Sequence, residues 1–306
     1  MRRGPVQHGI SLRCEQGFVI VAVLWLVAAL AALAMIFSAY LSNSARAVAL
    51  NDTALQAEAL VSAGVELSAY QLRLTGEDAR PARGSFQTRL NGAGLSVAFV
   101  SEAARIDLNA APKELLSGLM SVLGASTEDA AQFADRIVGW RTRAAAEASG
   151  REDALYLAAG RSYSPRQAPF AHVNELGLVL GLPAELVVRA LPFVTVFSRL
   201  SGVDVLNAAP EVVAALPGMT PLLLRQFLSD RGSLPNDPTA IATALGGAKG
   251  ATTQKSQAYR LKIRIHFPNG WESASEVVIS LGAEEEPYHV LSWQTDVASR
   301  RAPARS

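Results

Sequence analysis

Residues that commonly carry out catalysis are few in this chain, and they do not form catalytic motifs. The sequence contains neither the G-x-S-x-G motif of serine nucleophiles nor a phosphate-binding P-loop. Gly92 and Gly94 lie in a turn pattern without the helix that a dinucleotide site requires. The four histidines show no metal-binding spacing: His8, His172, His266 and His289. We therefore assign no catalytic residue and expect that the protein is not an enzyme.

Composition and charge narrow the class of protein further. The chain has 306 residues, of which 18% are charged, and its formal net charge is +1. These values disfavour both a disordered chain and a multi-span membrane protein, and the length suggests about two domains. The single cysteine, Cys14, cannot form an internal disulfide. The near-neutral charge argues against a nucleic-acid binder.

An uncharged segment near the amino terminus is long enough to cross a membrane. Residues 18–41 contain no charged side chain, and a helix of this length at 1.5 Å per residue extends about 36 Å. Arg2, Arg3 and Arg13 precede the segment, which places the amino terminus in the cytoplasm by the positive-inside rule. We expect a single-pass protein whose remaining residues lie outside the cytoplasm.

Gly17 is a candidate for proteolytic processing, because it stands directly before the apolar segment. A secretory signal peptide has an apolar region of about 7–15 residues followed by a small-residue cleavage site. Here the run is longer and the small residue comes first. The order Glu15-Gln16-Gly17-Phe18, followed by an apolar helix, resembles the class III leader of type IV pilins and type II secretion pseudopilins. The resemblance implies cleavage by a prepilin peptidase between Gly17 and Phe18 and N-methylation of Phe18; a plain signal anchor is the alternative.

Ala22 departs from the pattern of that superfamily. Most members carry a glutamate at the fifth residue after the cleavage site, where this chain has Ala22. A carboxylate within a membrane helix is costly unless it is paired, and the resemblance implies a pair with the terminal amine of a neighbouring subunit. The K-type minor pseudopilin characteristically lacks this glutamate, as suits a tip subunit with nothing stacked above it. Ala22 is therefore the candidate determinant of filament position.

Beyond the membrane segment, the pattern predicts a long helix and then a small sheet. Val61, Val65 and Leu72 continue an apolar spacing of three and four residues. The alternative of a coiled-coil stalk is weakened by the many alanines in this seam. Alternating residues flank Asn91-Gly92 and fill residues 259–267, which predicts antiparallel strands. We predict an α+β, pilin-like fold: a long amino-terminal transmembrane helix packed on a small antiparallel sheet, with a large all-α domain inserted.

The pentapeptide Leu-Asn-Ala-Ala-Pro occurs twice in the region of the helical insertion, at residues 108–112 and 206–210. Asn109 and Asn207 are candidate N-caps or turn-formers, and each proline can begin a helix. The second copy also suggests a helix-hairpin-helix DNA-binding element. Its hairpin, residues 216–221, has one glycine where that motif has two, and little positive charge. A helical packing unit is the favoured interpretation.

Three further motifs lie between the two copies and resemble the inserted domain of K-type pseudopilins in their order. They are the I-x-x-W-R pattern ending at Trp140-Arg141, a linker ending in Pro169-Phe170, and Asn174-Glu175-Leu176. We expect Trp140, Tyr156 and Phe170 to pack in a core.

The resemblance implies calcium as a possible ligand of the inserted domain. Family members often carry several acidic residues after the Trp-Arg pair, whereas this chain offers Glu147, Glu152 and Asp153. Calcium requires about six to eight oxygen ligands, so these three residues do not make a complete site. We predict no certain cofactor and leave calcium open, with these residues as weak candidate ligands.

The same patterns set the expected domain boundaries. The first 75 residues consist of a cleaved prepilin leader and one helix with a transmembrane part and a periplasmic part: residues 1–17, 18–41 and 42–75. The sheet, the helical insertion and a flexible arginine-rich tail make up the rest: residues 84–105 with 256–295, 106–250, and 296–306.

The resemblance implies a minor pseudopilin of a type II secretion system, located at or near the tip of the periplasmic pseudopilus. The implied partners are the I- and J-type minor pseudopilins, the pseudopilus, the prepilin peptidase and the inner-membrane assembly platform, with no nucleic acid. The implied location is the bacterial inner membrane, with the carboxyl-terminal domain in the periplasm. A minor type IV pilin and a membrane-tethered helix-hairpin-helix DNA-binding protein are the alternatives.

Overall fold

The structure is a computed structural model that describes residues 15–143, 150–282 and 286–296. The chain divides into two units, Met1–Ala59 and Leu60–Ser306. Helix α1 (Glu15–Leu74) begins in the first unit and ends in the second. No proline or glycine interrupts residues 18–63, so nothing in the local sequence breaks the helix there.

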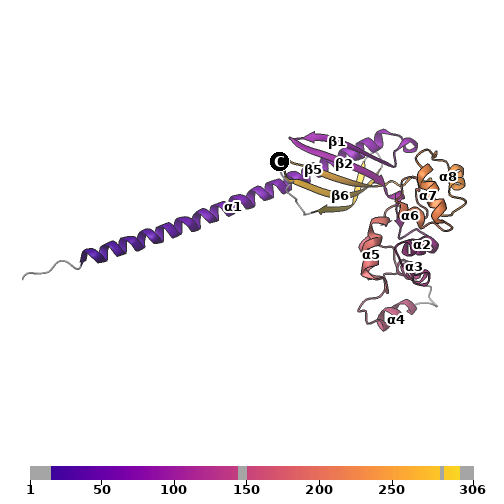
Figure 1. Cartoon of the computed structure of the whole chain (residues 1–306), viewed down its shortest axis with the longest axis horizontal. Helices are drawn as coiled ribbons and strands as arrows, with labels where there is room; N and C mark the ends of the chain where they lie inside the picture. The colour runs from indigo at the N-terminus through magenta and orange to yellow at the C-terminus, as the bar shows by residue number, and fades with distance from the viewer. Residues whose placement is uncertain (1–14, 144–149, 283–285, 297–306) are drawn as a thin grey trace, which may run out of the picture. The chain divides into compact units, whose positions relative to one another are not determined.

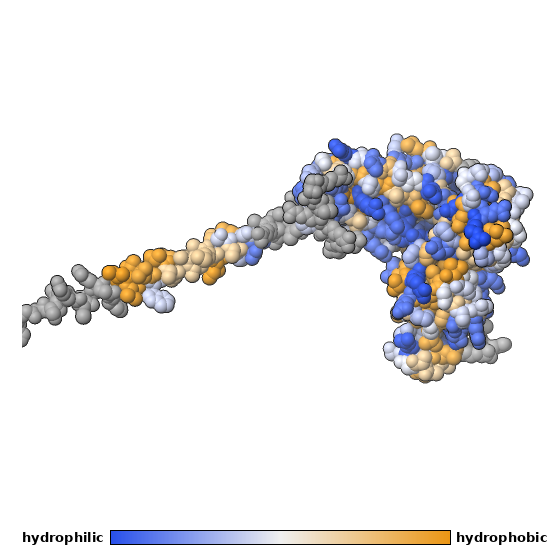
Figure 2. Space-filling model, in the orientation of Figure 1, coloured by the Kyte–Doolittle hydropathy of each residue, from blue (hydrophilic) through white to orange (hydrophobic). Residues whose placement is uncertain are grey.

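The first unit contains the apolar segment of α1. Ile20–Asn43 has 24 residues with a mean hydropathy of 2.9, and none of the segment is buried within the protein. Hydrophobic side chains surround this part of the helix (Figure 2). By length and composition the segment can cross a membrane.

In the second unit, the end of α1 packs on one face of a sheet. Its buried side chains recur every three or four residues along one stripe: Leu60, Val61, Val65, Ala69 and Leu72. Gly64 lies at the closest approach, because a Cβ atom there would be 3.3 Å from the side chain of Ile263 and 3.4 Å from that of Val97. A small residue in this stripe lets the helix lie directly on the sheet.

The sheet has five antiparallel strands in the order β1-β2-β5-β6-β7 (Figure 1). The strands are β1 (Arg83–Leu90), β2 (Ala93–Ser101), β5 (Ala258–His266), β6 (Glu272–Leu281) and β7 (Tyr288–Asp296). Asn91 and Gly92 both have positive φ angles, 49° and 80°, as the two-residue turn of a β1–β2 hairpin requires. Strand β2 then pairs with β5, and Val97 lies opposite Ile263.

The insertion between β2 and β5 is mostly helical. Its α-helices are α2 (Lys113–Val122), α3 (Thr127–Arg141), α4 (Arg151–Ala158), α5 (Ala184–Ala190), α6 (Pro210–Ala214), α7 (Pro221–Asp230) and α8 (Pro238–Ala244). Short 3-10 turns and a parallel two-stranded ribbon join them: η2 (Glu102–Ala104), η4 (Val173–Leu178), η5 (Leu191–Phe193), β3 (Ile106–Asp107) and β4 (Val194–Thr195). A further turn, η1 (Glu77–Ala79), connects α1 to β1.

The insertion has a hydrophobic core of its own. Leu115, Leu119 and Ile137 are fully buried where α2 and α3 pack together. Trp140, Tyr156 and Phe170 are also buried, as expected from the sequence. The ring centroids of Trp140 and Phe170 are 6.0 Å apart and the rings stack at 29°. Side-chain caps begin three of the helices: Ser126 for α3, Thr220 for α7 and Asp237 for α8.

Candidate functional site

The residues expected to be processed lie at the start of α1. Gly17 and Phe18 are both within this helix, which begins at Glu15. Ala22 lies in the apolar part of α1 and is exposed. Residues 1–14, and with them most of the expected leader, lie outside the described residues. The span Ile20–Asn43 contains no charged residue, so it places no carboxylate at the fifth position after Gly17.

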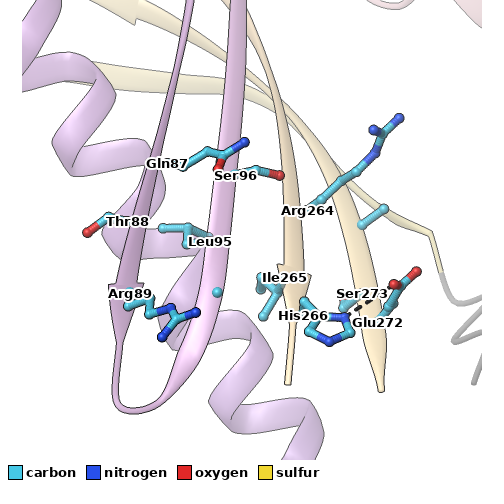
Figure 3. Close-up of a pocket in the computed structure, with 12 residues that line it drawn as sticks. Gln87, Thr88, Arg89, Leu95, Ser96, Arg264, Ile265, His266, Glu272 and Ser273 are labelled. Atoms are coloured by element: carbon cyan, nitrogen blue, oxygen red, sulfur yellow. Dashed lines mark hydrogen bonds and ion pairs between the residues drawn. The ribbon is translucent and has the colours of Figure 1, made fainter. Parts of the chain in front are cut away.

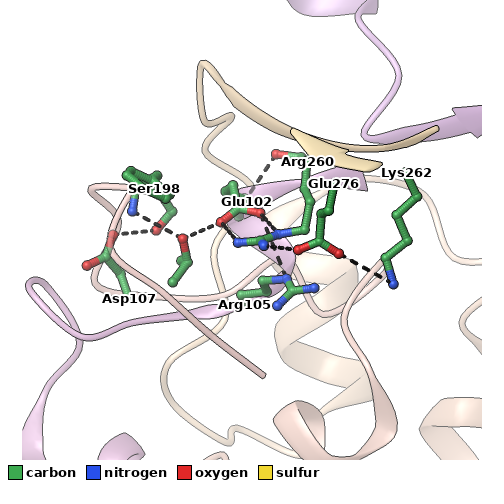
Figure 4. A network of polar contacts seen from close by, with 11 residues as sticks. Glu102, Arg105, Asp107, Ser198, Arg260, Lys262 and Glu276 are labelled. Atoms are coloured by element: carbon green, nitrogen blue, oxygen red, sulfur yellow. Dashed lines mark hydrogen bonds and ion pairs between the residues drawn. The ribbon is translucent and has the colours of Figure 1, made fainter. Parts of the chain in front are cut away.

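A buried charge network joins the helical insertion to the sheet (Figure 4). Glu102 directly follows β2 and is fully buried. Arg260 of β5 donates to both of its carboxylate oxygens, at 2.8 and 3.0 Å. The hydroxyl of Thr195 on β4 also donates to Glu102, and Arg260 contacts Glu276 of β6. Two bonds from one guanidinium to one carboxylate fix both side chains in position.

The network compensates the cost of burying its charges. Burial lowers the pKa of Arg260, but the hydrogen bonds and charges of Glu102 and Glu276 outweigh burial, so the net shift of this pKa is upward. Arg105 lies 3.8 Å from Glu102, and both burial and the charge of Arg260 lower its pKa. Removing Glu102 would leave the guanidinium groups of Arg105 and Arg260, which are 19% and 12% exposed, with less compensation.

Asp107, at the end of β3, stabilises the next turn of the same region. It is 1% exposed. One of its oxygens accepts hydrogen bonds from the Ser198 hydroxyl at 3.0 Å and the Arg199 amide at 2.7 Å. The other oxygen accepts a hydrogen bond from the backbone N–H of Asn109 at 2.8 Å. These contacts hold Arg199 at a φ of 59°, which a residue with a side chain rarely adopts.

The two Leu-Asn-Ala-Ala-Pro copies are turns whose carbonyl groups are held by arginines. Arg141 donates to the carbonyl oxygens of Leu108 and Ala111, the latter at 2.6 Å. Arg231 donates to the carbonyl oxygen of Ala208 at 2.9 Å. The arginine of the I-x-x-W-R pattern therefore has a structural role, because it donates hydrogen bonds to carbonyl groups of the turn that precedes α2.

Of the two roles expected for the asparagines of the two copies, turn-former is confirmed and N-cap is wrong. Pro112 and Ala209 occupy the N-cap positions of α2 and α6, without side-chain caps. The Asn109 amide group instead bridges to the backbone of Phe170, donating at 3.0 Å and accepting at 2.7 Å. Asn207 donates to the side chain of Asp204 at 2.7 Å.

Glu175 connects the other motifs of the insertion through hydrogen bonds. Its carboxylate accepts hydrogen bonds from the Trp140 indole at 3.2 Å, from Arg166 at 3.1 Å and from the Ala171 amide at 3.0 Å. These contacts place η4 against the end of α3. The motif residues therefore hold the insertion together.

The acidic residues considered for calcium do not converge on a site. Glu152 forms an ion pair with Arg136 at 3.2 Å, and Asp153 accepts a hydrogen bond from Gln167 at 3.3 Å. Glu147 lies outside the described residues. Among the described residues, no three His, Cys, Asp or Glu side chains gather in a group that could hold a metal ion.

An open hollow of about 770 Å³ lies on the face of the sheet opposite α1 (Figure 3). Arg89 and Arg264 line it, and Ser96 on β2 lies between Gln87 and Arg264. His266 and Glu272 contact each other there at 3.2 Å, and both are more than half exposed, at 62% and 53%. An exposed pair of this kind is solvated, and we assign it no chemical role.

Sequence reasoning missed Glu102 and Arg260, which join the insertion to the sheet, and Asp107, which holds a turn within the insertion. Arg260 was visible only as one of the polar residues alternating along its strand. Glu102 and Arg260 are 158 positions apart in the sequence, so no spacing pattern could connect them.

A long apolar amino-terminal helix, packed at its end on an antiparallel sheet with a helical insertion, defines a pilin-like protein. Residues 89–199 match the family model for type II secretion system (T2SS) protein K. This match confirms the resemblance found in the sequence for that part of the chain, and it supports a minor pseudopilin role in type II secretion.

A solved structure confirms the fold. The chain is similar to one in the crystal structure of the GspK-GspI-GspJ complex from the enterotoxigenic Escherichia coli type 2 secretion system. The TM-score is 0.57 at 20% sequence identity, over 81% of this chain and 99% of that chain. The α+β, pilin-like fold with a helical domain is therefore confirmed. No curated protein sequence matches the chain significantly.

Proposed function

We propose that this minor pseudopilin lies at or near the tip of the periplasmic pseudopilus and supports export of folded proteins across the outer membrane. The observation that carries the proposal is the apolar span of α1, which has Ala22 in place of a glutamate. An apolar helix can pack among other membrane helices in a filament. Without the carboxylate it cannot pair with the terminal amine of a subunit above it, which favours the last position in the stack.

Processing of the chain is part of this proposal. A prepilin peptidase cuts after Gly17, removes residues 1–17 and methylates the amine of Phe18. The charged residues before Gly17 are then lost, and the mature chain begins with its apolar helix. The three arginines of the leader orient the chain in the inner membrane with its amino terminus in the cytoplasm and its folded domain in the periplasm.

The proposed partners are the other minor pseudopilins, of the I and J types, together with the pseudopilus and the inner-membrane assembly platform. The similar solved structure is a complex of GspK with GspI and GspJ, and a tip subunit needs neighbours of this kind below it. The chain contributes position and shape rather than catalysis, because its motif residues are engaged in holding the insertion together. We propose no nucleic-acid partner, and calcium stays without assigned ligands.

We also propose the domain order expected from the sequence. The sheet takes residues 84–105 and 256–295, and the helical insertion takes 106–250. The bounds of the outer strands, Arg83 for β1 and Asp296 for β7, lie within one residue of these limits. The insertion would then have its own core beside the sheet, and Glu102 and Arg260 would join the two parts of the periplasmic region.

The test is intact mass spectrometry of the protein from its native membrane, with and without an active prepilin peptidase. We expect a species that begins at N-methylated Phe18 only when the peptidase is active. A chain that retains residues 1–17 in both strains would overturn the processing and, with it, the place in the filament. A deletion strain complemented by this chain should regain secretion; recovery of twitching or DNA uptake instead would favour a type IV pilin.

A further inference from the structure

Small residues line the outer surface of β2, on the face of the sheet opposite α1. Leu95 and Val97 of this strand are buried on the side of α1. Because side chains alternate along a strand, the residues next to them point to the opposite face. These residues are Gly94, Ser96 and Ala98, and none of them has a long side chain. The outer surface of β2 is therefore low.

Long basic side chains flank β2 on both sides. Directly opposed residues of neighbouring strands share a face of the sheet. On β5, Arg264 lies opposite Ser96 and Lys262 lies opposite Ala98. On β1, Arg89 lies opposite Gly94, next to the β1–β2 turn. We define the basic trough by two floor residues, two residues of β1 and two residues of β5: Ser96, Ala98, Arg83, Arg89, Lys262 and Arg264.

The dimensions of the basic trough suit one extended polypeptide. The hollow of about 770 Å³ lies at its end near the β1–β2 turn, and Figure 3 shows Arg89 and Arg264 on the strands that flank β2 there. Strands β1 and β5 are about 10 Å apart across β2, which is too narrow for a helix of about 10 Å between side-chain walls. From Gly94 to Val100, β2 extends about 20 Å, the length of about six extended residues.

The arginines of the basic trough have no acidic partner within the described part of the chain. No carboxylate there forms an ion pair with Arg83, Arg89 or Arg264, and all three are exposed. Arg260 on the same strand as Arg264 differs, because it is 12% exposed and bound to Glu102. The whole chain has a formal net charge of only +1, so these three guanidinium groups are a local concentration of positive charge.

The nearest acidic residues of the outer face lie beyond β5, on β6. Glu272 contacts His266 at 3.2 Å, and Glu276 is 3.9 Å from Lys262. Lys262 is still 62% exposed, so its ammonium group is accessible to a partner. The charges of this face are therefore separated, with the arginines around β2 and the two carboxylates on β6.

This arrangement of charge favours an acidic chain as the occupant. A single exposed arginine is merely solvated, but a cluster of them recognises acidic motifs, because each guanidinium can donate two parallel hydrogen bonds to one carboxylate. In an extended chain, side chains on one face repeat about every 6.8 Å. Lys262 and Arg264 are two residues apart on β5 and share this spacing, so acidic residues at alternate positions can contact both.

Other anionic partners fit the basic trough less well. Binding to a membrane surface needs apolar side chains that enter the lipid, and among the exposed large hydrophobic residues described for β1, β2 and β5 there is only Val100, at 37%. Single-stranded nucleic acids stack on aromatic side chains, and the six residues of the trough include none. The chain's own glutamates at 284–286 follow Leu281, about 30 Å along β6 from Glu272 and the hollow.

We propose that the basic trough binds an extended, acidic segment of another protein, which lies along β2 between the basic side chains of β1 and β5. The low floor lets the backbone of the segment approach the sheet. The arginines on both sides receive its carboxylates. The interaction does not depend on where the subunit stands in a filament, so it can be tested on the isolated chain.

The first test is fluorescence anisotropy of the full chain in detergent with a labelled peptide that alternates glutamate and serine. The same peptide with glutamine in place of glutamate is the control for charge. We expect saturable binding of the glutamate peptide only, and a Kd that rises with salt concentration. Equal binding of both peptides, or no saturable binding of either, would overturn the proposal.

Charge reversal then locates the binding site. Arg89→Glu and Arg264→Glu should each raise the Kd of the glutamate peptide about tenfold or more, because an attractive contact becomes a repulsive one. Arg225→Glu makes the same change of charge at an exposed position of α7 and should change the Kd by less than about twofold. An equal loss in all three variants would reveal an effect of net charge and would contradict a defined site.

A change of volume without charge tests the floor of the trough. Ser96→Trp should weaken peptide binding about tenfold, because the indole fills the space above β2. Ser121→Trp, at an exposed position of α2, should leave binding unchanged. Far-ultraviolet circular dichroism of each variant checks that it is folded. Unchanged binding in folded Ser96→Trp would show that the peptide does not lie along β2.

Two further results would assign the basic trough to a different occupant and so overturn the proposal. The first is binding to phosphatidylglycerol vesicles that Arg89→Glu abolishes and that the glutamate peptide does not displace. The second is self-association of the chain in analytical ultracentrifugation that Arg89→Glu abolishes, which would make a second copy the occupant.

Discussion

Gly118 offers a test of how closely the helical insertion is packed, because two physical effects there have opposite signs. Gly118 lies within α2, where replacement by alanine should stabilise the helix by about 1 kcal/mol through backbone entropy. A Cβ atom at this position, however, would be 2.1 Å from the carbonyl oxygen of Ala215, just after α6. An ordinary contact begins at 3.4 Å, so the two backbones would have to separate by about 1.3 Å, the difference between these distances.

At Gly118 the steric clash should outweigh the gain in helix propensity, because the obstructing atom belongs to the backbone and cannot rotate away. Overpacking costs about 1–3 kcal/mol, and a shift of two helices belongs at the upper end of that range. After subtraction of the gain in helix propensity, we expect Gly118→Ala to lower the free energy of unfolding by about 2 kcal/mol. Urea titration of the full chain in detergent, followed by far-ultraviolet circular dichroism, measures this change.

Gly139 is the matched control, because it is a helical glycine in a looser site. A Cβ atom there would be 3.3 Å from the carboxyl carbon of Glu152, which is the far end of a flexible side chain. Gly139→Ala should therefore keep or raise stability, by up to about 1 kcal/mol. If Gly118→Ala proved as stable as Gly139→Ala, the close approach of α2 and α6 would be refuted.

Three further changes probe the buried polar groups. Glu102→Gln should lower the free energy of unfolding by about 3 kcal/mol or more, since the charge of the largely buried Arg260 loses a carboxylate partner. The control, Glu272→Gln at an exposed ion pair, should change this free energy by less than about 1 kcal/mol. Equal effects of the two substitutions in urea titrations would contradict a stabilising role of the Glu102 network. The hydroxyl of Ser275 is buried without a hydrogen-bond partner among the described residues, so Ser275→Ala should be neutral or stabilising by up to about 1 kcal/mol, and a loss of stability would reveal a partner. Burial raises the pKa of Asp204 above 3.8 in spite of its hydrogen bonds, so its contribution to stability is present at low pH and is lost as the pH rises through the folded-state pKa. Relative to Asp204→Asn, the wild type should gain stability in urea titrations as the pH falls from neutrality toward 3.8, and a difference that does not change with pH would count against the shift.

Local patterns were sufficient to predict the elements that define the fold. The uncharged run and the apolar spacing at Val61, Val65 and Leu72 indicated α1, and the latter three side chains are buried on the sheet. Asn91-Gly92 indicated the first hairpin because both residues tolerate positive φ angles. These signals lie within a few residues of each other, so composition and spacing carry them.

Contacts between distant segments could not be predicted in the same way. The pairing of β2 with β5 joins strands separated by the whole insertion, and the parallel pairing of Ile106 with Val194 lies inside it. Asn109 has the residue type of an N-cap, but its side chain bonds the backbone of Phe170 instead. Tertiary contacts decide between such uses of one side chain, and they leave no periodic pattern in the sequence.

The location of the Glu102 network connects this packing to the role of the protein. The chain leaves the sheet at Ser101 and returns to it at Ala258, and Ser101 lies opposite Tyr259 in the register. Glu102 and Arg260 therefore bond at the base of the insertion, where the two crossing segments lie side by side. Under the proposed function the subunit works through position and shape, so it needs the insertion fixed at the point where Glu102 and Arg260 bond.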